Sequence, residues 1–288
     1  MRVGFIGLGR IGAPMAQRLA QGGHELFVFD IRDEAMREAA ARCGARAVRS
    51  PAEAAAAADA VVISVPGPKE DVEVMLGAQG VLAGARAGLL VVDATTVTVK
   101  LSRDHAARCR ERRVDHLDAP VSVAQRPDIT GTLTVMAGGE RSAFERARSI
   151  LECMGSRVHH VGASGAGTAV KLINQSILVA YMAAFAEGLA RGEALGIPRD
   201  LILDILDPSA AGSPVIATKY DEIRGRSDKR FAVDSAVRYL AMAQESAQQL
   251  WLDTPVLDAA LASLRAAAGE GLGADDLIVA RHRYHRDA

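Results

Sequence analysis

A single lysine interrupts the most apolar stretch of this 288-residue chain. From Ala163 to Ala186, Lys171 is the only ionisable side chain besides Tyr181, whose phenol is neutral at pH 7. Removal from water lowers the pKa of a lysine amine, which can then donate and accept a proton near neutral pH. Asn174 and Gln175 follow at helical spacing and share the lysine's face. The pattern indicates either an acid/base site or a lysine that reaches water along the helix surface.

A glycine-rich turn near the N-terminus joins two short apolar runs. Arg2–Ile6 leads into Gly7-Leu8-Gly9-Arg10-Ile11-Gly12, a helical stretch follows, and the second run, Glu25–Phe29, ends at Asp30. Glycines at this spacing permit a tight turn, close approach of backbone N–H groups to a pyrophosphate, and close packing of helix on strand. The acid, 18 residues after Gly12, can bind a ribose 2′-hydroxyl. The combination predicts dinucleotide binding, with an unligated turn of the same shape as the alternative.

Polar residues also follow other buried runs of the expected sheet. In an open α/β sheet, ligands bind beyond the carboxyl ends of the strands. Val65 and Pro66 end one run, and Thr95 and Thr96 follow the next. The two threonine hydroxyls could contact a ribose or a substrate, or could cap a helix. Ser122, in an expected loop, could bind substrate or bond its own backbone.

The elements that position these residues fall into two parts. Over residues 1–163, short apolar strands alternate with helices, which predicts a Rossmann-type, mostly parallel, doubly wound sheet. From residue 164 onward the pattern is helical, beginning with one long helix at about 165–190. We therefore expect a dinucleotide-binding domain over 1–163 and an all-α substrate and dimerisation domain over 164–288. The expected helices include 95–112 in the first part and 200–206, 214–223, 231–252, 256–268 and about 274–285 in the second.

Bulk properties argue against several classes of protein. With 34 Lys and Arg against 35 Asp and Glu, the net charge of −1 gives no reason to expect nucleic acid or a membrane surface as partner. The apolar run before Gly7 is too short for a signal peptide, and Lys171, Asn174 and Gln175 break the long apolar stretch. The three cysteines are widely spaced, and the seven histidines show no helical or hairpin ligand spacing. We expect a cytoplasmic protein with reduced thiols and no metal site.

Four segments together resemble the β-hydroxyacid dehydrogenase family, and the resemblance covers essentially the whole chain. Phe5–Ala16 is similar to the family's glycine-rich start, and Asp118–Ser122 (DAPVS) matches its substrate-binding segment. Gly131–Gly139 resembles the continuation of that segment, and Gly165–Lys171 is similar to the signature that carries the catalytic lysine. The resemblance implies a Rossmann domain, an interdomain helix and an all-α domain that often mediates dimerisation.

The resemblance also implies an activity. It indicates hydride transfer between NAD(P) and a small β-hydroxy acid or its semialdehyde or keto form, with Lys171 as general acid and base, in a homodimer or homotetramer. Asp30 favours NAD over NADP because a 2′-phosphate would meet a like charge, whereas Arg32 acts in the opposite direction. The residues expected at the cofactor are Gly7, Leu8, Gly9, Arg10, Ile11, Gly12, Asp30, Ile31, Arg32, Val65, Pro66, Thr95 and Thr96.

Two departures from the family pattern concern the substrate. After Ser122 the family usually has two glycines, and this chain has Val123 and Ala124. Where the family usually has a substrate-binding lysine in the C-terminal domain, this chain has Arg238 and Tyr239. Arg238 could bind a carboxylate bidentately, or could form a surface ion pair. The expected substrate contacts are Ser122, Val123, Ala124, Asn174, Gln175 and Arg238.

Three alternatives follow from the same residues. Imine reductases of the same superfamily usually carry Asp or Tyr at the lysine position, so Lys171 argues against that activity. A non-catalytic dinucleotide-binding module, as in relatives that lack the lysine, is the second. The segment Ile129–Leu133 also resembles that of sulfolactaldehyde reductases, although their adjacent Arg-Thr pair is absent.

Overall fold

The computed structural model describes residues 1–288 except 124–132, 218, 225–230 and 279–288. The chain divides into two compact units, Met1–Lys171 and Leu172–Ala288. The first unit contains a sheet with helices on both faces. The described part of the second unit contains helices and one isolated bridge, between Ala232 and Asp276.

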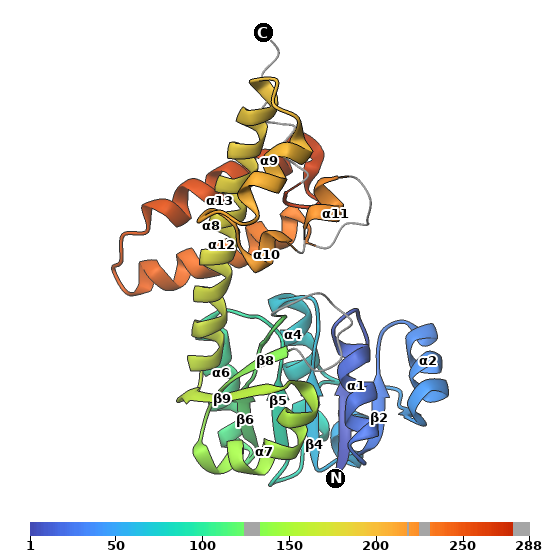
Figure 1. Ribbon diagram of the computed structural model, residues 1–288. Helices are drawn as coiled ribbons and strands as arrows, with labels where there is room; N and C mark the ends of the chain where they lie inside the picture. The colour runs from blue at the N-terminus through green and yellow to red at the C-terminus, as the bar shows by residue number, and fades with distance from the viewer. Residues whose placement is uncertain (124–132, 218, 225–230, 279–288) are drawn as a thin grey trace. The chain divides into compact units, whose positions relative to one another are not determined.

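A nine-stranded sheet forms the centre of the first unit (Figure 1). Neighbouring strands in the order β3-β2-β1-β4-β5-β6 are parallel. β8 then pairs antiparallel with both β6 and β7 and parallel with β9. The strands are β1 (Arg2–Ile6), β2 (Glu25–Phe29), β3 (Arg46–Ala47), β4 (Ala60–Ile63), β5 (Leu90–Asp93), β6 (Asp115–Asp118), β7 (Val121–Val123), β8 (Leu133–Gly138) and β9 (Arg157–Gly162).

Helices cover both faces of this sheet, because successive side chains along its strands are apolar and pack into two cores, one on each face. In β4, Val62 packs into one core, and Val61 and Ile63 pack into the other. The first core also receives Met15 of α1, and the second receives Met75 of α4. Successive strand residues point to opposite faces, so strands buried on both sides are apolar throughout. The helices are α1 (Gly12–Gln21), α2 (Asp33–Cys43), α3 (Pro51–Ala57), α4 (Pro68–Leu76), α5 (Val81–Gly84), α6 (Val99–Glu111) and α7 (Arg141–Met154).

The long helix α8 (Ala166–Ala194) begins in the first unit and continues into the second. In the second unit, a buried ion pair between Lys219 Nζ and Asp276 Oδ2 (2.5 Å) fixes the segment that follows the last helix. The same carboxylate oxygen accepts the N–H of Phe231 at 3.0 Å. The further helices are α9 (Arg199–Leu206), α10 (Pro214–Ala217), α11 (Tyr220–Ile223), α12 (Val233–Gln249), α13 (Pro255–Ala267) and a π-helical turn (Ala268–Leu272).

The predicted fold class, a Rossmann-type sheet followed by a helical region, is confirmed. Four local predictions are wrong. The helix expected from Thr95 begins only at Val99, because Thr98 is its N-cap. Val121–Val123 is a strand and not a loop. The helix expected over 214–223 consists of α10 and α11, and residues 274–278 of the expected last helix form turns, a bend and the bridge from Asp276 to Ala232. The rest of that last helix lies outside the described residues.

The apolar character of α8 admits two readings. Its length and its mean hydropathy of 1.4 are sufficient for a membrane-spanning helix, yet a core helix of a globular protein meets the same criteria. Lys171 and Gln175 on this helix are both buried in protein. The three cysteines are unpaired, as predicted.

Candidate active site

The glycine-rich turn between β1 and α1 has the shape that its sequence predicts. Gly7 has φ +93°, and a Cβ there would lie 2.1 Å from the carbonyl oxygen of Ser64. A Cβ on Gly12 would lie 1.9 Å from the oxygen of Gly7. Gly9 differs, because nothing lies within 4 Å of its Cβ position. Gly7 and Gly12 are therefore required by packing, and Gly9 leaves open space above the turn.

The backbone N–H groups of this turn are placed to bind an anion. Those of Gly9, Arg10 and Ile11 donate no hydrogen bond to a described residue, and α1 begins directly after them. Unpaired N–H groups at a helix N-terminus favour a phosphate, both by hydrogen bonding and by the helix dipole. The turn therefore fits the pyrophosphate of a dinucleotide.

The carboxylate of Asp30 lies beside this turn and is already engaged. Its Oδ2 accepts the N–H of Leu8 at 2.7 Å, and its Oδ1 accepts both the N–H (2.9 Å) and Nε (3.2 Å) of Arg32. Arg32 Nη2 also donates to the carbonyl oxygen of Leu8 at 3.1 Å. Of roughly four acceptor positions on a carboxylate, three are occupied. Asp30 is 8% exposed, and the adjacent Ile31 is 91% exposed.

The residues after β4 and β5 contact each other at the same edge of the sheet. Thr95 Oγ1 accepts the N–H of Val65 at 3.3 Å, and Asp93 Oδ1 accepts the N–H of Thr95 at 2.9 Å. Thr95 is buried, Thr96 is half-buried and Pro66 is exposed. Because α6 begins at Val99, the alternative in which Thr95 or Thr96 caps that helix is wrong.

The start of α8 is held by an acid that the sequence analysis did not single out. Asp118 Oδ1 accepts the N–H of Gly165, and Oδ2 accepts that of Thr168, both at 2.7 Å. Burial raises the pKa of Asp118 to about 6, although these N–H groups favour its charged form. A Cβ on Gly167 would lie 2.1 Å from the oxygen of Met136, so only glycine permits this approach. The acid and the helix start are 47 residues apart, and no local pattern links them.

Lys171 is held in the protein interior one turn further along α8. Its exposed fraction is 8%, which contradicts the alternative in which its side chain runs along the helix surface to water. Burial lowers the pKa of its amine to about 8. The lysine can therefore exchange a proton close to neutral pH, as its apolar surroundings in the sequence predicted.

The remaining expected substrate contacts divide between the two units. Ser122 lies in β7 of the first unit, half-buried and in register with Thr134 of β8. Val123 ends the same strand, and Ala124 lies outside the described residues. On α8 in the second unit, Asn174 Nδ2 donates to Gln175 Oε1 at 3.1 Å. Gln175 is buried and Asn174 half-buried.

Among the described residues, Arg238 of α12 forms no ion pair, which was its alternative interpretation. Its Nη2 donates to Ser235 Oγ at 3.3 Å, and its guanidinium lies 5.8 Å from the centre of the Tyr239 ring. No described acid lies within ion-pair distance, and its Nε is buried without a hydrogen-bond partner among the described residues. A buried guanidinium N–H without a partner fits an anion-binding role.

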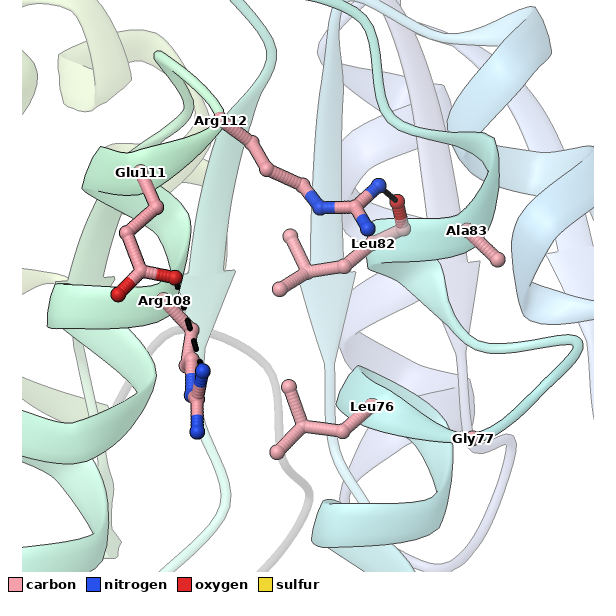
Figure 2. Close-up of a pocket in the computed structure, with 7 residues that line it drawn as sticks. All are labelled: Leu76, Gly77, Leu82, Ala83, Arg108, Glu111 and Arg112. Atoms are coloured by element: carbon pink, nitrogen blue, oxygen red, sulfur yellow. Dashed lines mark hydrogen bonds and ion pairs between the residues drawn. The ribbon is translucent and has the colours of Figure 1, made fainter.

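A surface pocket of about 430 Å³ lies elsewhere in the first unit, between α4, α5 and α6 (Figure 2). Its polar groups contact one another: Arg112 Nη1 donates to the carbonyl oxygen of Leu82 at 2.8 Å, and Arg108 lies 3.6 Å from Glu111. None of the expected cofactor or substrate residues lines it.

Comparison with known families covers both parts of the chain. Residues 2–162 match the family described as the NAD binding domain of 6-phosphogluconate dehydrogenase. Residues 165–282 match the family described as "NAD-binding of NADP-dependent 3-hydroxyisobutyrate dehydrogenase".

Three curated relatives align over nearly all of the chain. The 2-(hydroxymethyl)glutarate dehydrogenase of Eubacterium barkeri is 32% identical, covering 96% of this chain and 92% of the relative. The NAD-dependent L-serine dehydrogenase of Pseudomonas aeruginosa is 33% identical, covering 98% and 97%. The 3-sulfolactaldehyde reductase of Escherichia coli is 34% identical, covering 95% and 92%.

Solved structures show the same architecture. A 3-hydroxyisobutyrate dehydrogenase from Salmonella typhimurium matches with a TM-score of 0.89 and 28% identity, over 98% of this chain and 99% of that one. An imine reductase from Pseudomonas sp. matches with a TM-score of 0.60 and 22% identity, over 99% of each chain. The second likeness concerns the fold alone.

Proposed function

The chain belongs to the β-hydroxyacid dehydrogenase family, and from this we propose that Lys171 is the general acid and base for hydride transfer on a small β-hydroxy acid. The protein is an NAD(P)-dependent dehydrogenase or reductase acting on CH–OH donors. The proposed substrate is a small β-hydroxy acid, or its semialdehyde or keto form. The observation that carries the proposal is the buried amine of Lys171, at the start of a helix in the unit with the dinucleotide-binding turn.

The lowered pKa of Lys171 suits it to both directions of the reaction. In oxidation, the neutral amine would take the proton from the substrate hydroxyl, and the carbon that bears this hydroxyl would lose a hydride. In reduction, the ammonium returns that proton to the developing alkoxide. With a pKa of about 8, roughly one amine in ten is neutral at pH 7, against roughly one in 3,000 at 10.5. The protonated form remains the major one at pH 7, so the amine can act both as a base in oxidation and as an acid in reduction.

The cofactor is proposed to lie along the turn at Gly7–Gly12, with its ribose beside Asp30. When bound, it supplies or accepts the hydride. The unpaired N–H groups of Gly9, Arg10 and Ile11 would bind its pyrophosphate, and Gly9 leaves space for it. The remaining proposed contacts are Leu8, Ile31, Arg32, Val65, Pro66, Thr95 and Thr96.

Substrate orientation is assigned to four polar side chains. Ser122 and the amides of Asn174 and Gln175 would bind the reacting end of the molecule. Arg238 would bind an acidic group, because its buried Nε has no partner among the described residues and its fork matches a carboxylate. The names of the three relatives describe small substrates with an acidic group, which is consistent with this assignment.

The cofactor is proposed to be NAD(H) rather than NADP(H). Asp30 would disfavour a 2′-phosphate by like charge, although its pairing with Arg32 reduces that effect. The Pseudomonas aeruginosa relative is NAD-dependent by name, which supports the same preference.

A second copy of the chain is the proposed protein partner, in a cytoplasmic homodimer or homotetramer. Ile173 and Ile177 on α8 are 59% and 68% exposed, and their four-residue spacing places them on one face. Exposed apolar pairs of this kind favour an interface.

One panel of assays tests the proposed function. Small hydroxy acids, their aldehydes and a cyclic imine are supplied with NAD(H) and NADP(H), using the native chain and Lys171→Ala. We expect turnover of a hydroxy acid or aldehyde that requires Lys171. Turnover of the imine alone, in the native chain, would instead assign an imine reductase.

A further inference from the structure

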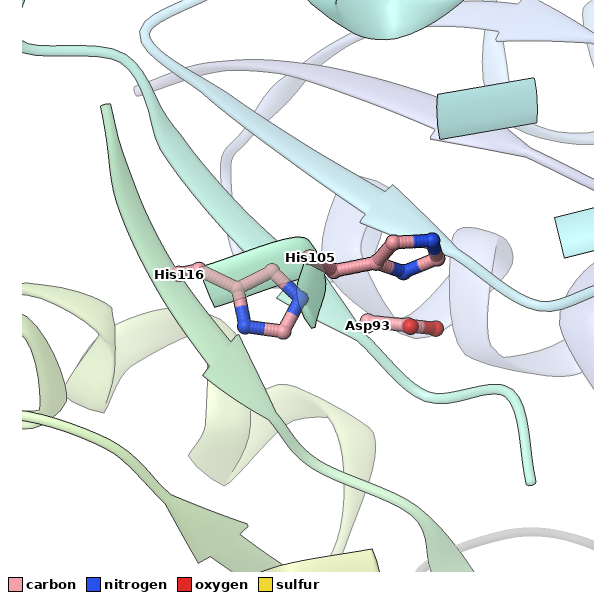
Figure 3. Close-up of side chains that lie close together, drawn as sticks. All are labelled: Asp93, His105 and His116. Carbon is pink, nitrogen blue, oxygen red and sulfur yellow. The ribbon is translucent and has the colours of Figure 1, made fainter. Parts of the chain in front are cut away.

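A cluster of buried polar side chains lies on the face of the sheet covered by α4 and α6. Asp93 ends β5, His105 lies on α6 and His116 on β6. Figure 3 shows the three side chains close together, and one potential ligand atom from each lies within 4.8 Å of the others. Their exposed fractions are 1%, 0% and 6%, so the protein surrounds all three.

Asp71 of α4 joins this cluster. Its Oδ2 lies 3.2 Å from His105 Nδ1, and both side chains are 0% exposed. Neither atom, however, forms a hydrogen bond with a described residue, and the same is true of Asp93 Oδ2 and of both ring nitrogens of His116. Buried polar atoms are nearly always hydrogen-bonded. This group of buried polar atoms without hydrogen bonds therefore indicates a bound group other than a hydrogen-bonding side chain.

The charges of the cluster favour a cation. No described lysine or arginine pairs with Asp71 or Asp93. The two buried carboxyl groups therefore have no counter-ion among the described residues, and buried carboxylates are usually paired or coordinate a metal.

We propose that Asp93, His105 and His116 bind a divalent transition-metal ion such as Zn²⁺, with Asp71 as the fourth ligand. Imidazole nitrogens and carboxylate oxygens are usual zinc ligands, whereas Mg²⁺ and Ca²⁺ prefer oxygen alone. Ligand atoms at tetrahedral positions ~2.0–2.1 Å from zinc are roughly 3.3 Å apart. The 3.2 Å between Asp71 Oδ2 and His105 Nδ1 agrees with that spacing.

The proposed site is closed and therefore structural. Four buried protein ligands leave no position for a substrate, unlike catalytic zinc sites. An ion there would join α4, β5, α6 and β6 through one residue of each. It would bind Asp93 through Oδ2, and Oδ1 would still accept the N–H of Thr95. The sequence analysis missed the site because its ligands come from separate elements and have no motif spacing.

The test measures metal binding directly and does not depend on activity. The full chain, without a histidine tag, is treated with a chelator and then titrated with Zn²⁺ alone by calorimetry. We expect about one ion per chain, with Kd below about 1 µM, and a higher Tm because the ion binds only the folded state. Co²⁺ in the same protein should give the visible absorption of a tetrahedral N/O site.

Substitutions then locate the ion. His105→Gln and His116→Gln should each weaken Zn²⁺ binding about 100-fold or more. Loss of an outer-shell partner of a metal ligand costs about 10–100-fold in affinity, and loss of a ligand itself should cost at least the upper value. Asp71→Asn should weaken it by a smaller factor. His159→Gln, which changes an exposed histidine, should leave the affinity unchanged. The proposal is overturned if the native chain takes up no ion and gives no Co²⁺ spectrum, or if both His105→Gln and His116→Gln bind Zn²⁺ as tightly as the native chain.

Discussion

Arg32 Nε lies 3.2 Å from Asp30 Oδ1, so the acid expected to select the cofactor is paired with the cation expected to oppose it. Arg32 is 59% exposed in its side chain, and Asp30 is 8% exposed. The arginine can therefore turn toward solvent, whereas the acid is fixed by the N–H of Leu8. A ribose hydroxyl that bonds Oδ1 would displace Arg32 Nε, because the exposed arginine side chain can move into water.

The first prediction concerns cofactor choice. The native chain should show a higher kcat/KM with NAD(H) than with NADP(H), and Asp30→Asn should lower the NAD(H) value about tenfold. The loss of one hydrogen bond to a charged group is worth about 1.5–3 kcal/mol. Steady-state kinetics with both cofactors on one substrate measure the change. Glu34→Gln removes a nearby exposed charge and should have no such effect. A native preference for NADPH would show that Arg32 governs the choice.

The second prediction concerns Lys171. Lys171→Ala should lower kcat by ~10²–10⁴-fold, the usual contribution of general acid–base catalysis. The Kd for the cofactor should stay within a few-fold, since the dinucleotide is proposed to contact the glycine-rich turn. Lys100→Ala, at an exposed lysine on α6, serves as the control. A rate within a few-fold of native on the same substrate would remove Lys171 from the mechanism.

The third prediction follows from the lowered pKa of this amine. Oxidation needs the neutral form, so its kcat/KM should rise with pH and level off above about 8. Reduction needs the ammonium, so its kcat/KM should be constant at lower pH and fall above about 8. pH–rate profiles in both directions measure this. Profiles whose inflection lies near 10.5 would mean that the amine is solvated during the reaction.

The fourth prediction separates the glycines that packing requires from the one that leaves space. Gly9→Ala should keep the native Tm, because nothing lies within 4 Å of the added methyl, but should weaken cofactor binding roughly tenfold or more. Gly12→Ala should lower the Tm, because its methyl would lie 1.9 Å from the oxygen of Gly7. Thermal unfolding and fluorescence titration with NADH measure the two effects. Unchanged NADH affinity in Gly9→Ala would place the pyrophosphate elsewhere.

The fifth prediction concerns the acidic group of the substrate. Arg238→Ala should raise KM roughly tenfold or more with a smaller change in kcat, by the loss of a charge-assisted hydrogen bond. Arg238→Lys should restore only part of this, because a lysine cannot bind a carboxylate bidentately. Arg265→Ala, at an exposed arginine of α13, should leave KM unchanged. Identical kinetics in both Arg238 variants and the native chain would show that the acidic group binds elsewhere.

The parts of the fold that local patterns determine were predictable from the sequence. The turn at Gly7–Gly12 and the strand before Asp30 are specified within 30 residues, by glycine geometry and by alternation of apolar runs. The burial of Lys171 was predictable as one of two alternatives, since few polar residues surround it in the helix.

Features that depend on distant partners were not predictable in the same way. β7 has only three residues and exists because it pairs with β8, across residues 124–132 of the chain. Asp118 caps α8 from a different strand, and Asp71, Asp93, His105 and His116 meet only because β5 and β6 are neighbours beneath α4 and α6. Such contacts follow from the order of the strands in the sheet, and that order cannot be predicted from residue spacing in the sequence.

The division of the chain directly after Lys171 has a practical consequence for engineering. The proposed proton carrier belongs to the unit with the glycine-rich turn, while Asn174, Gln175 and Arg238 belong to the other. A chimaera joined at Leu172, within the continuous helix α8, would keep Lys171 and exchange those three side chains for those of another family member. The join preserves helical register when no residue is added or lost. Substrate choice could then be changed by exchanging one segment of the gene, with the hydride-transfer half left intact.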